Sequence, residues 1–229
     1  IDLLTGHQPM KKKTGGSTWT IVYNGESYNM KELRRELRSE GAVFETESDT
    51  EVILTGYILH GETYIKKMNG IFAVAIWDEG EDTLYLFRDR LGIKPLFYTF
   101  LDNTLIFSSE IKGLLEYPGV KPQVDKEGLC EILALGPAKT YGKGVFRNIK
   151  EVLPGHRIRF SKDSLEEQAY WKLESRPHED SYEKTVEKTA WLVEDAVKKQ
   201  MLSDIPISTF LSGGVDSSLV TAVCARELK

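Results

Sequence analysis

Two apolar runs near the middle of the chain constrain its fold more than any other feature. Residues 71–77 are almost continuously apolar, and residues 84–87 resume the pattern after the polar stretch 78–82. A strand with apolar side chains on both faces must be covered on both faces, because an uncovered face would expose hydrocarbon to water. We therefore predict two central strands of a sheet inside a layered fold.

The spacing of apolar residues predicts the other elements. Alternating polar and apolar residues favour strands, and a spacing of three to four residues favours helices. Asp102-Asn103 is a turn-prone pair and predicts a hairpin. The polar, proline-containing stretch 173–181 predicts a domain boundary. Further strands are predicted at 17–23, 95–100, 104–108, 157–160 and 206–211, and helices at 29–37, 49–59, 64–68, 110–117, 125–135, 181–203 and from Asp216 onward.

The composition bounds the class of protein. The 229 residues are 41% hydrophobic and 28% charged with a net charge of −5, which is typical of a globular protein and gives no electrostatic footprint for nucleic acid. We interpret the basic run Lys11–Lys13 as a solvated loop. No stretch approaches the roughly 20 apolar residues of a membrane-spanning helix, and residues 1–4 do not resemble a signal peptide. These features predict a cytoplasmic protein with neither nucleic-acid nor membrane partners.

Cysteines and histidines provide no metal or disulfide framework. Cys130 and Cys224 both lie in apolar helical patterns, which predicts buried, reduced thiols. The four histidines are far apart in the sequence and lack the spacing of metal ligands. We interpret them as ordinary surface or core residues: His7, His60, His156 and His178.

The glycine-rich stretch 210–218 (FLSGGVDSS) has the residue types of a polyphosphate site. Glycines allow a tight turn and a close backbone approach to a ligand, and the N-terminus of the following helix favours an anion. Asp216 beside a polyphosphate suggests a divalent cation between them. A purely structural turn with a helix cap at Asp216 or Ser217 is the alternative. The pattern lacks the lysine of P-loop nucleotide-binding proteins and resembles the PP-loop of ATP pyrophosphatases instead.

A second group of residues lies earlier in the chain. Asn24-Gly25 follows a predicted strand, where a side-chain amide and a backbone N–H can converge on a developing oxyanion. Asp49 lies at a predicted helix start, where it could cap the helix or bind an ammonium group. A simple turn at Asn24-Gly25 and a simple cap at Ser48-Asp49 are the alternatives.

Seven motifs in order resemble a known family. They closely resemble glutamine-dependent asparagine synthetases of the B type and extend over nearly the whole chain. The resemblance implies an α+β fold: an N-terminal-nucleophile (class II) glutaminase, built as a four-layer α-β-β-α sandwich, over 1–175. The start of an α/β ATP pyrophosphatase-like domain would follow over 181–229. The motifs are YNGESYN (23–29), ESD with TEVIL (47–54), NGIFAVAIWD (69–78), FRDRLGIKPLFY (87–98), FSSEIKGLL (107–115), LPGH (153–156) and FLSGGVDSS (210–218).

The resemblance also implies a reaction and its residues. Members use Mg-ATP to convert aspartate to asparagine through β-aspartyl-AMP, with glutamine as nitrogen donor and ammonia passing through a tunnel. Asn24 and Gly25 match the oxyanion hole, and these two with Glu26 and Asp49 match the glutamine pocket. Asp216 would lie near magnesium, and a buried salt-bridge network is predicted for the signature residues Arg88, Asp89, Arg90 and Lys94. The residues that match the ATP loop are Leu211, Ser212, Gly213, Gly214, Asp216, Ser217 and Ser218.

The chain departs from the family pattern at its ends. The family nucleophile is an N-terminal cysteine, whereas residue 1 is Ile, and neither Cys130 nor Cys224 matches its position. We therefore expect an internal piece that is inactive alone and that associates through exposed apolar surface; a homodimer is left open. A β-lactam synthetase-like enzyme without glutaminase activity and a catalytically dead scaffold are the alternatives.

Overall fold

The computed structural model describes residues 5–135, 140–162 and 164–228. Contacts between residues divide the chain into two compact units, Asp2–Lys172 and Leu173–Lys229. Within the described ranges, no helix combines the length and the apolar character needed to cross a membrane.

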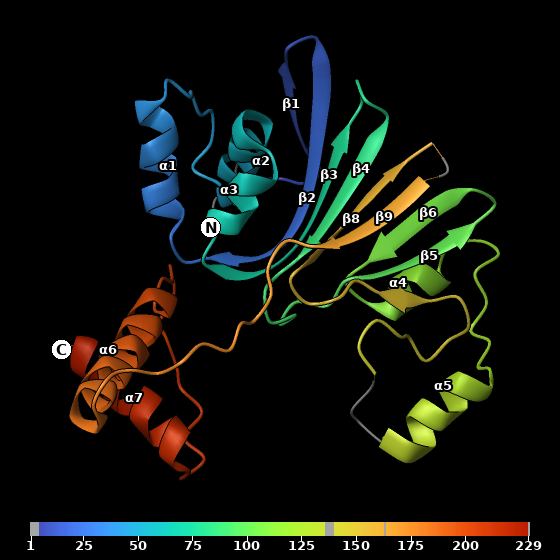
Figure 1. The fold of residues 1–229 in the computed structure, drawn as a ribbon. Coiled ribbons are helices and arrows are strands. Elements are labelled where there is room, and N and C mark those ends of the chain that lie inside the picture. Colours follow the sequence, from blue (N-terminus) through green and yellow to red (C-terminus); the bar gives the residue numbers. More distant parts are fainter. Residues whose placement is uncertain (1–4, 136–139, 163, 229) are drawn as a thin grey trace. The chain divides into compact units, whose positions relative to one another are not determined.

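The described residues of the first unit form two antiparallel sheets (Figure 1). The larger sheet has the order β1-β2-β3-β4-β8-β9, and the smaller has the order β6-β5-β7. The larger sheet consists of β1 (Met10–Thr14), β2 (Ser17–Ser27), β3 (Gly70–Asp78), β4 (Thr83–Arg88), β8 (His156–Ser161) and β9 (Ser164–Ala169). The smaller sheet consists of β5 (Phe97–Leu101), β6 (Thr104–Ser108) and β7 (Lys150–Glu151).

Helices cover the two sheets from outside. On the larger sheet lie α1 (Met30–Ser39), α2 (Asp49–His60) and α3 (Glu62–Lys67), and α4 (Ile111–Leu115) packs on the smaller one. A further helix, α5 (Lys126–Cys130), continues as one π-helical turn. Cys130 at its end is exposed, so the prediction that this thiol is buried is wrong.

Three separate apolar clusters show that the unit has four layers. Along β3, Phe72, Val74 and Ile76 face the cluster shared with α1, α2 and α3, while Ala73 and Ala75 face the cluster shared with the smaller sheet. On β5, Tyr98 joins this middle cluster, and its neighbour Phe97 packs toward α4 on the other face. Because successive strand residues point to opposite faces, one apolar run serves two layers. This confirms the predicted α-β-β-α sandwich and the central position of β3 and β4.

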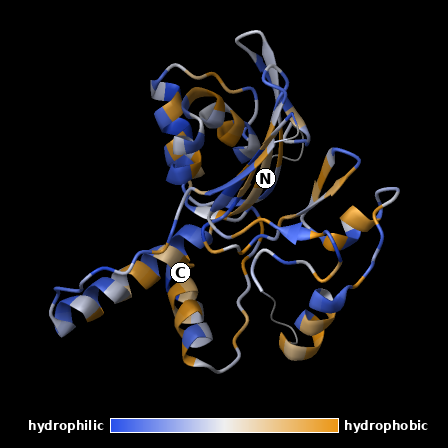
Figure 2. Ribbon diagram, turned by 45° about the vertical axis from the view of Figure 1, so that its right-hand side comes forward, coloured by the Kyte–Doolittle hydropathy of each residue, from blue (hydrophilic) through white to orange (hydrophobic). Residues whose placement is uncertain are grey.

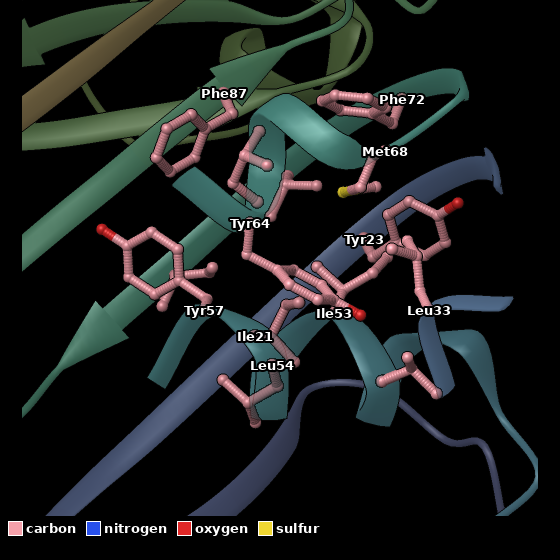
Figure 3. Packing of buried hydrophobic residues seen from close by; sticks show 14 of the residues in the cluster. Ile21, Tyr23, Leu33, Ile53, Leu54, Tyr57, Tyr64, Met68, Phe72 and Phe87 are labelled. Atoms are coloured by element: carbon pink, nitrogen blue, oxygen red, sulfur yellow. The ribbon is translucent and has the colours of Figure 1, made fainter. Parts of the chain in front are cut away.

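The cluster beneath the helices contains the largest buried side chains (Figure 3). Tyr64 of α3 is fully buried, and its ring fills the space over Gly56. A Cβ on Gly56 would lie 2.2 Å from that ring, which explains a glycine in the middle of α2. Figure 3 shows Tyr23 of β2 and Phe87 of β4 at opposite sides of this cluster.

A buried network connects β4 to the loop that follows it. Arg88 pairs with Glu151 at 3.0 Å, and both side chains are almost completely buried. The Arg88 guanidinium also donates to the backbone oxygens of Val152, Gly92 and Lys94, and Asp89 accepts from the N–H groups of Leu91, Ile93 and Lys94. Arg90 instead donates to the oxygen of Lys66. The network therefore links sheet and loop mainly through backbone groups, and it includes the buried ion pair of Arg88 with Glu151.

Two edge strands differ from the sequence-based expectations. Lys11–Lys13 is not a loop, because these residues belong to β1 and pair with β2. The polar strand β9 was not predicted. Neither segment carries the apolar alternation that signals a strand, since both lie at an edge of the larger sheet with few buried side chains. The predicted hairpin at Asp102-Asn103 is confirmed, and both residues have the positive φ of a tight hairpin turn.

The described part of the second unit, residues 173–228, forms the helices α6 (Tyr182–Gln200) and α7 (Val215–Glu227). The strand predicted at 206–211 is wrong, because this segment forms no strand in the structure. A strand exists only through hydrogen bonds to a neighbour, and no described segment pairs with it. Figure 2 shows α6 as largely hydrophilic and α7 with a hydrophobic stretch. Of the described residues in this unit, only Val223 and Cys224 are buried.

Candidate functional site

Asn24 and Gly25 lie near the end of β2, opposite Ala73 and Phe72 of β3. A Cβ on Gly25 would lie 2.2 Å from the carbonyl oxygen of Ile71, a distance that no side chain tolerates. Glycine is therefore required here by the close approach of β3, rather than by an unusual backbone angle.

The backbone N–H of Gly25 points away from β3. Phe72, which lies opposite Gly25 on β3, donates its N–H to the Asp89 carboxylate, and its C=O accepts from the Asp89 N–H. Tyr23 donates its N–H to the Gln8 side chain on the β1 side of β2, and alternate strand residues direct their N–H groups the same way. The ladder with β1 begins only at Met10 and Ile21. The Gly25 N–H therefore points to the edge of β2 that faces away from β3. At this position no described residue of β1 pairs with β2.

The side chain of Asn24 reaches from the larger sheet to the segment after β6. Its Nδ2 donates to the Ser109 Oγ at 3.0 Å. An amide nitrogen carries two hydrogens, so this bond fixes the orientation of the group and leaves one N–H for a ligand. Asn24 and Gly25 can thus present neighbouring donors, as an oxyanion site requires.

An acidic group lies beside Tyr23. The Tyr23 side chain is buried, and its hydroxyl has no hydrogen-bond partner of normal geometry among the described residues. Burial raises the pKa of this phenol above its ordinary value, and the nearby Asp49 and Glu26 carboxylates raise it further. The structure therefore brings together three of the residues that the sequence analysis placed in two separate motifs.

Asp49 is the first residue of α2 and follows the N-cap Ser48, whose Oγ accepts from the Thr50 N–H at 3.2 Å. Burial raises the pKa of the Asp49 carboxyl, although a hydrogen bond from the Thr50 N–H opposes this effect. No described lysine or arginine forms an ion pair with Asp49. A half-buried carboxylate that lacks a cationic partner in the described chain suits an ammonium group brought by a ligand.

The glycine loop of the second unit precedes α7. Gly213 has φ +84°, and a Cβ there would meet nothing within 4 Å, so its conformation alone favours glycine. Gly214 caps α7 without a side-chain hydrogen bond, which leaves the first N–H groups of the helix available. The Ser212 and Ser217 hydroxyls lie 3.0 Å apart. The remaining predicted residues, Leu211, Asp216 and Ser218, lie in the same loop or the first turn of α7.

This loop fits a phosphate better than a bare metal ion. An uncapped helix N-terminus beside serine hydroxyls favours an anion. Within the described ranges, no group of three or more His, Cys, Asp or Glu side chains gathers to hold a metal ion. Asp216 could therefore hold magnesium only together with the oxygens of a bound nucleotide.

Neither cysteine belongs to the elements that hold Asn24, Gly25 and Asp49. Cys130 lies at the end of α5, and Cys224 is buried in α7 of the second unit. The group formed by Asn24, Gly25 and Asp49 thus supplies hydrogen-bond donors and a carboxylate, and neither thiol lies on the elements that carry it.

Several residues of the site were missed by sequence reasoning. Ser109 contacts Asn24 across 85 positions of sequence, a separation that no local pattern reveals. Arg34 and Glu51 hold the loop before Asp49 through hydrogen bonds to its backbone. For Glu51 a signal existed, because Ser48 and Glu51 have the S-x-x-E spacing of a helix capping box.

Comparison with known proteins agrees with the geometry. Residues 1–171 match the model of the glutamine amidotransferase domain family, and residues 188–229 match that of the asparagine synthase family. The solved structure of glutamine phosphoribosylpyrophosphate amidotransferase from B. subtilis, complexed with ADP and GMP, superposes with a TM-score of 0.51. That match has 15% identity and covers 96% of this chain and 47% of the other, so it supports the fold alone.

Curated relatives are similar along the whole chain. Asparagine synthetase [glutamine-hydrolyzing] 3 of Bacillus subtilis is 50% identical over 229 residues, which is 100% of this chain and 37% of the relative. Asparagine synthetase [glutamine-hydrolyzing] 1 of the same organism is 36% identical over 99% of this chain and 35% of its own length. The chain thus spans about a third of the length of these relatives. With the four-layer sandwich and the match over residues 1–171, these findings show that the chain belongs to the family of glutamine amidotransferase domains.

Proposed function

We propose that the protein carrying this chain is a glutamine-hydrolysing asparagine synthetase. The first unit would be its glutaminase domain, over residues 1–175, and residues 181–229 would begin its ATP-dependent synthetase domain. The overall reaction takes glutamine, aspartate and ATP to asparagine, glutamate, AMP and pyrophosphate. We place it in the cytoplasm, with small molecules as its partners.

One observation carries the glutaminase half: the donors of Asn24 and Gly25 lie on the same strand as Glu26 and Tyr23, beside Asp49. Asp49 and Glu26 would hold the α-ammonium group of glutamine. The amide of Asn24 and the N–H of Gly25 would stabilise the oxyanion that forms when a thiolate attacks the side-chain amide. Departure of ammonia leaves a glutamyl thioester, which water hydrolyses to glutamate.

The glycine loop supports the ATP-dependent half. The N–H groups at the start of α7 and the hydroxyls of Ser212, Ser217 and Ser218 would bind the phosphates of ATP. Leu211, Gly213 and Gly214 would shape the turn, and Asp216 would hold magnesium, which neutralises charge on the pyrophosphate leaving group. The β-carboxylate of aspartate would displace pyrophosphate, and ammonia would then displace AMP from the aspartyl adenylate.

The test uses the protein at its full natural length with amide-¹⁵N glutamine, aspartate and Mg-ATP. We expect ¹⁵N in the asparagine side chain and one pyrophosphate per asparagine. Pyrophosphate without labelled asparagine would favour a ring-forming relative, and no turnover of any substrate would favour a scaffold.

Two matched variants separate the half-reactions. Asp49→Asn should abolish glutamine-dependent synthesis and preserve synthesis from added ammonia. Asp216→Asn should abolish pyrophosphate release with either nitrogen source and preserve glutamine hydrolysis. If Asp49→Asn retained full activity with glutamine, the assignment of the glutamine pocket would be wrong.

A further inference from the structure

The loop that leads into Asp49 has no regular secondary structure and is nevertheless held firmly. Residues 43–48 form the second part of the connection between α1 and α2 and belong to no helix or strand. Polar backbone groups in such a segment need partners from elsewhere. In this loop, the buried charged side chains of Arg34 on α1 and Glu51 on α2 supply several of these partners.

Glu51 binds the N–H groups of the loop. Its side chain is only 6% exposed. Its carboxylate accepts from the Glu45 N–H at 3.0 Å, from the Thr46 N–H at 2.7 Å and from the Thr46 hydroxyl at 2.8 Å. Lys12 of β1 supplies the balancing charge at 3.2 Å. Burial opposes ionisation, but these hydrogen bonds outweigh it and lower the pKa of Glu51 below its ordinary value.

Arg34 binds the carbonyl groups of the same loop. It lies on α1 with 9% of its side chain exposed. One guanidinium nitrogen donates to the Thr46 oxygen at 2.7 Å, and another donates to the Ser48 oxygen at 2.9 Å. The guanidinium also lies 4.8 Å from the centre of the Phe44 ring. The planar fork of arginine suits two carbonyls at once, which a lysine ammonium on its single stem does not.

The two residues fix Asp49 without neutralising it. Arg34 holds the carbonyl of Ser48, the residue directly before Asp49, and Glu51 lies two residues after it on the same helix. The described ion pairs of Arg34 and Lys12 are with Glu47 and Glu51, not with Asp49. Neither Arg34 nor Lys12 therefore neutralises Asp49, while the backbone that carries it is held on both sides.

We propose that Arg34 and Glu51 are positioning residues that set the affinity of Asp49 for the α-ammonium group of glutamine. This inference rests on the proposed function, because it requires Asp49 to bind that group. Neither residue touches the substrate in this proposal. Both act through the backbone of the loop.

The experiment compares two substrates of the protein at its full natural length: glutamine and 4-carbamoylbutanoate, which lacks the α-amino group. In Arg34→Lys and Glu51→Gln we expect KM for glutamine to rise about tenfold, equivalent to a loss of about 1.4 kcal/mol of binding free energy. The kcat of glutamine hydrolysis should stay within about twofold. Hydrolysis of 4-carbamoylbutanoate should be unchanged, because it makes no use of Asp49.

Controls and milder variants keep the test decisive. Arg35→Lys and Glu32→Gln change exposed residues of α1 and should behave as wild type. If Arg34→Lys unfolds, Thr46→Val removes one hydroxyl from the loop, keeps both charges and should show the same selective loss. An equal loss with both substrates, or no loss with either, would overturn the inference.

Asp49→Asn serves as the reference in the same assays. If it abolishes the preference for glutamine over 4-carbamoylbutanoate while Arg34→Lys and Glu51→Gln keep it, only the positioning role fails. If Asp49→Asn itself keeps the preference, the glutamine pocket of the proposed function fails and the positioning role fails with it.

Discussion

The loop before Asp49 and the glycine loop before α7 are both short connections to a helix N-terminus, yet they are built differently. The first is held by buried Arg34 and Glu51 through hydrogen bonds to its backbone. The second is exposed and is held mainly by contacts among its own serines and glycines. The first loop is thus preorganised by its own unit, whereas the second gains little from the residues described around it. The difference extends to the two units as a whole.

The largest expected effect comes from the contrast in burial. Phe72 is fully buried beneath α2 and α3, whereas Leu192 on α6 is 56% exposed. Phe72→Ala should lower the free energy of unfolding by about 3–5 kcal/mol, and Leu192→Ala should change it by less than about 0.5 kcal/mol. Urea unfolding followed by fluorescence measures both. Comparable losses would show that the second unit is packed as tightly as the first.

The sequence predicted the parts of the fold that follow from apolar periodicity. Phe72, Val74 and Ile76 alternate with Ala73 and Ala75, so two covered faces could be inferred directly. The edge strands β1 and β9 could not, because their residues meet water and carry little apolar pattern. The strand expected at 206–211 failed for a related reason, since a strand depends on a neighbour that its own sequence does not specify.

The candidate site was predictable only in its local motifs. Asn24, Gly25 and Asp49 each occupy a recognisable turn or cap position, and so does the glycine loop. Ser109 and Arg34 act through contacts that depend on packing between distant segments. Such contacts have no periodic signature, so only a structure reveals them.

A second contrast concerns why glycine is needed at Gly25 and at Gly213. Gly25→Ala would place a Cβ 2.2 Å from the Ile71 oxygen, so we expect a loss of about 2–3 kcal/mol in stability from overpacking. Gly213→Ala meets no atom within 4 Å but must keep φ near +84°. This conformation costs about 1–2 kcal/mol for a residue with a Cβ. Thermal unfolding of each unit measures these losses, and a larger loss for Gly213→Ala would reverse the contrast.

A change at Ser109 tests whether a fixed orientation of the Asn24 amide matters for glutamine hydrolysis. Ser109→Ala removes the acceptor that orients the Asn24 amide. We expect kcat of glutamine hydrolysis to fall about tenfold with KM nearly unchanged, since an oxyanion donor acts mainly in the transition state. Ser108→Ala, the neighbouring change, is the control. A rise in KM without a fall in kcat would contradict an orienting role.

The smallest expected effect concerns pH. Burial raises the pKa of the Asp49 carboxyl above its ordinary value, so its ionised form is lost at a higher pH than that of an exposed aspartate. KM for glutamine should therefore rise as pH falls through that raised pKa. Asp49→Asn should remove this dependence in binding measurements. An unchanged pH profile in the variant would assign the titration to another group.

The pKa of Glu51 is shifted in the opposite direction to that of Asp49, and this shift affects the stability of the fold. Its pKa is lowered in the folded protein, so its ionised carboxylate stabilises the fold above its unfolded pKa, and this stability is lost as pH falls through the folded pKa. Glu51→Gln should flatten the acid limb of a stability curve measured by urea unfolding. An identical acid limb would show that the loop is held by other contacts.

The first residue of β1, Met10, is also the point where its pairing with β2 stops, and this has a consequence for inhibitors of the site. The Gln8 side-chain amide bonds to both the N–H and the C=O of Tyr23, as a strand residue would, and Pro9 beside it has no N–H to offer. The ladder between β1 and β2 therefore stops at Ile21, and the Gln8 side chain extends it only to Tyr23, two residues before Gly25. An extended peptide that added itself to this stretch of β2 would occupy the Gly25 N–H, so such a peptide should act as an inhibitor competitive with glutamine.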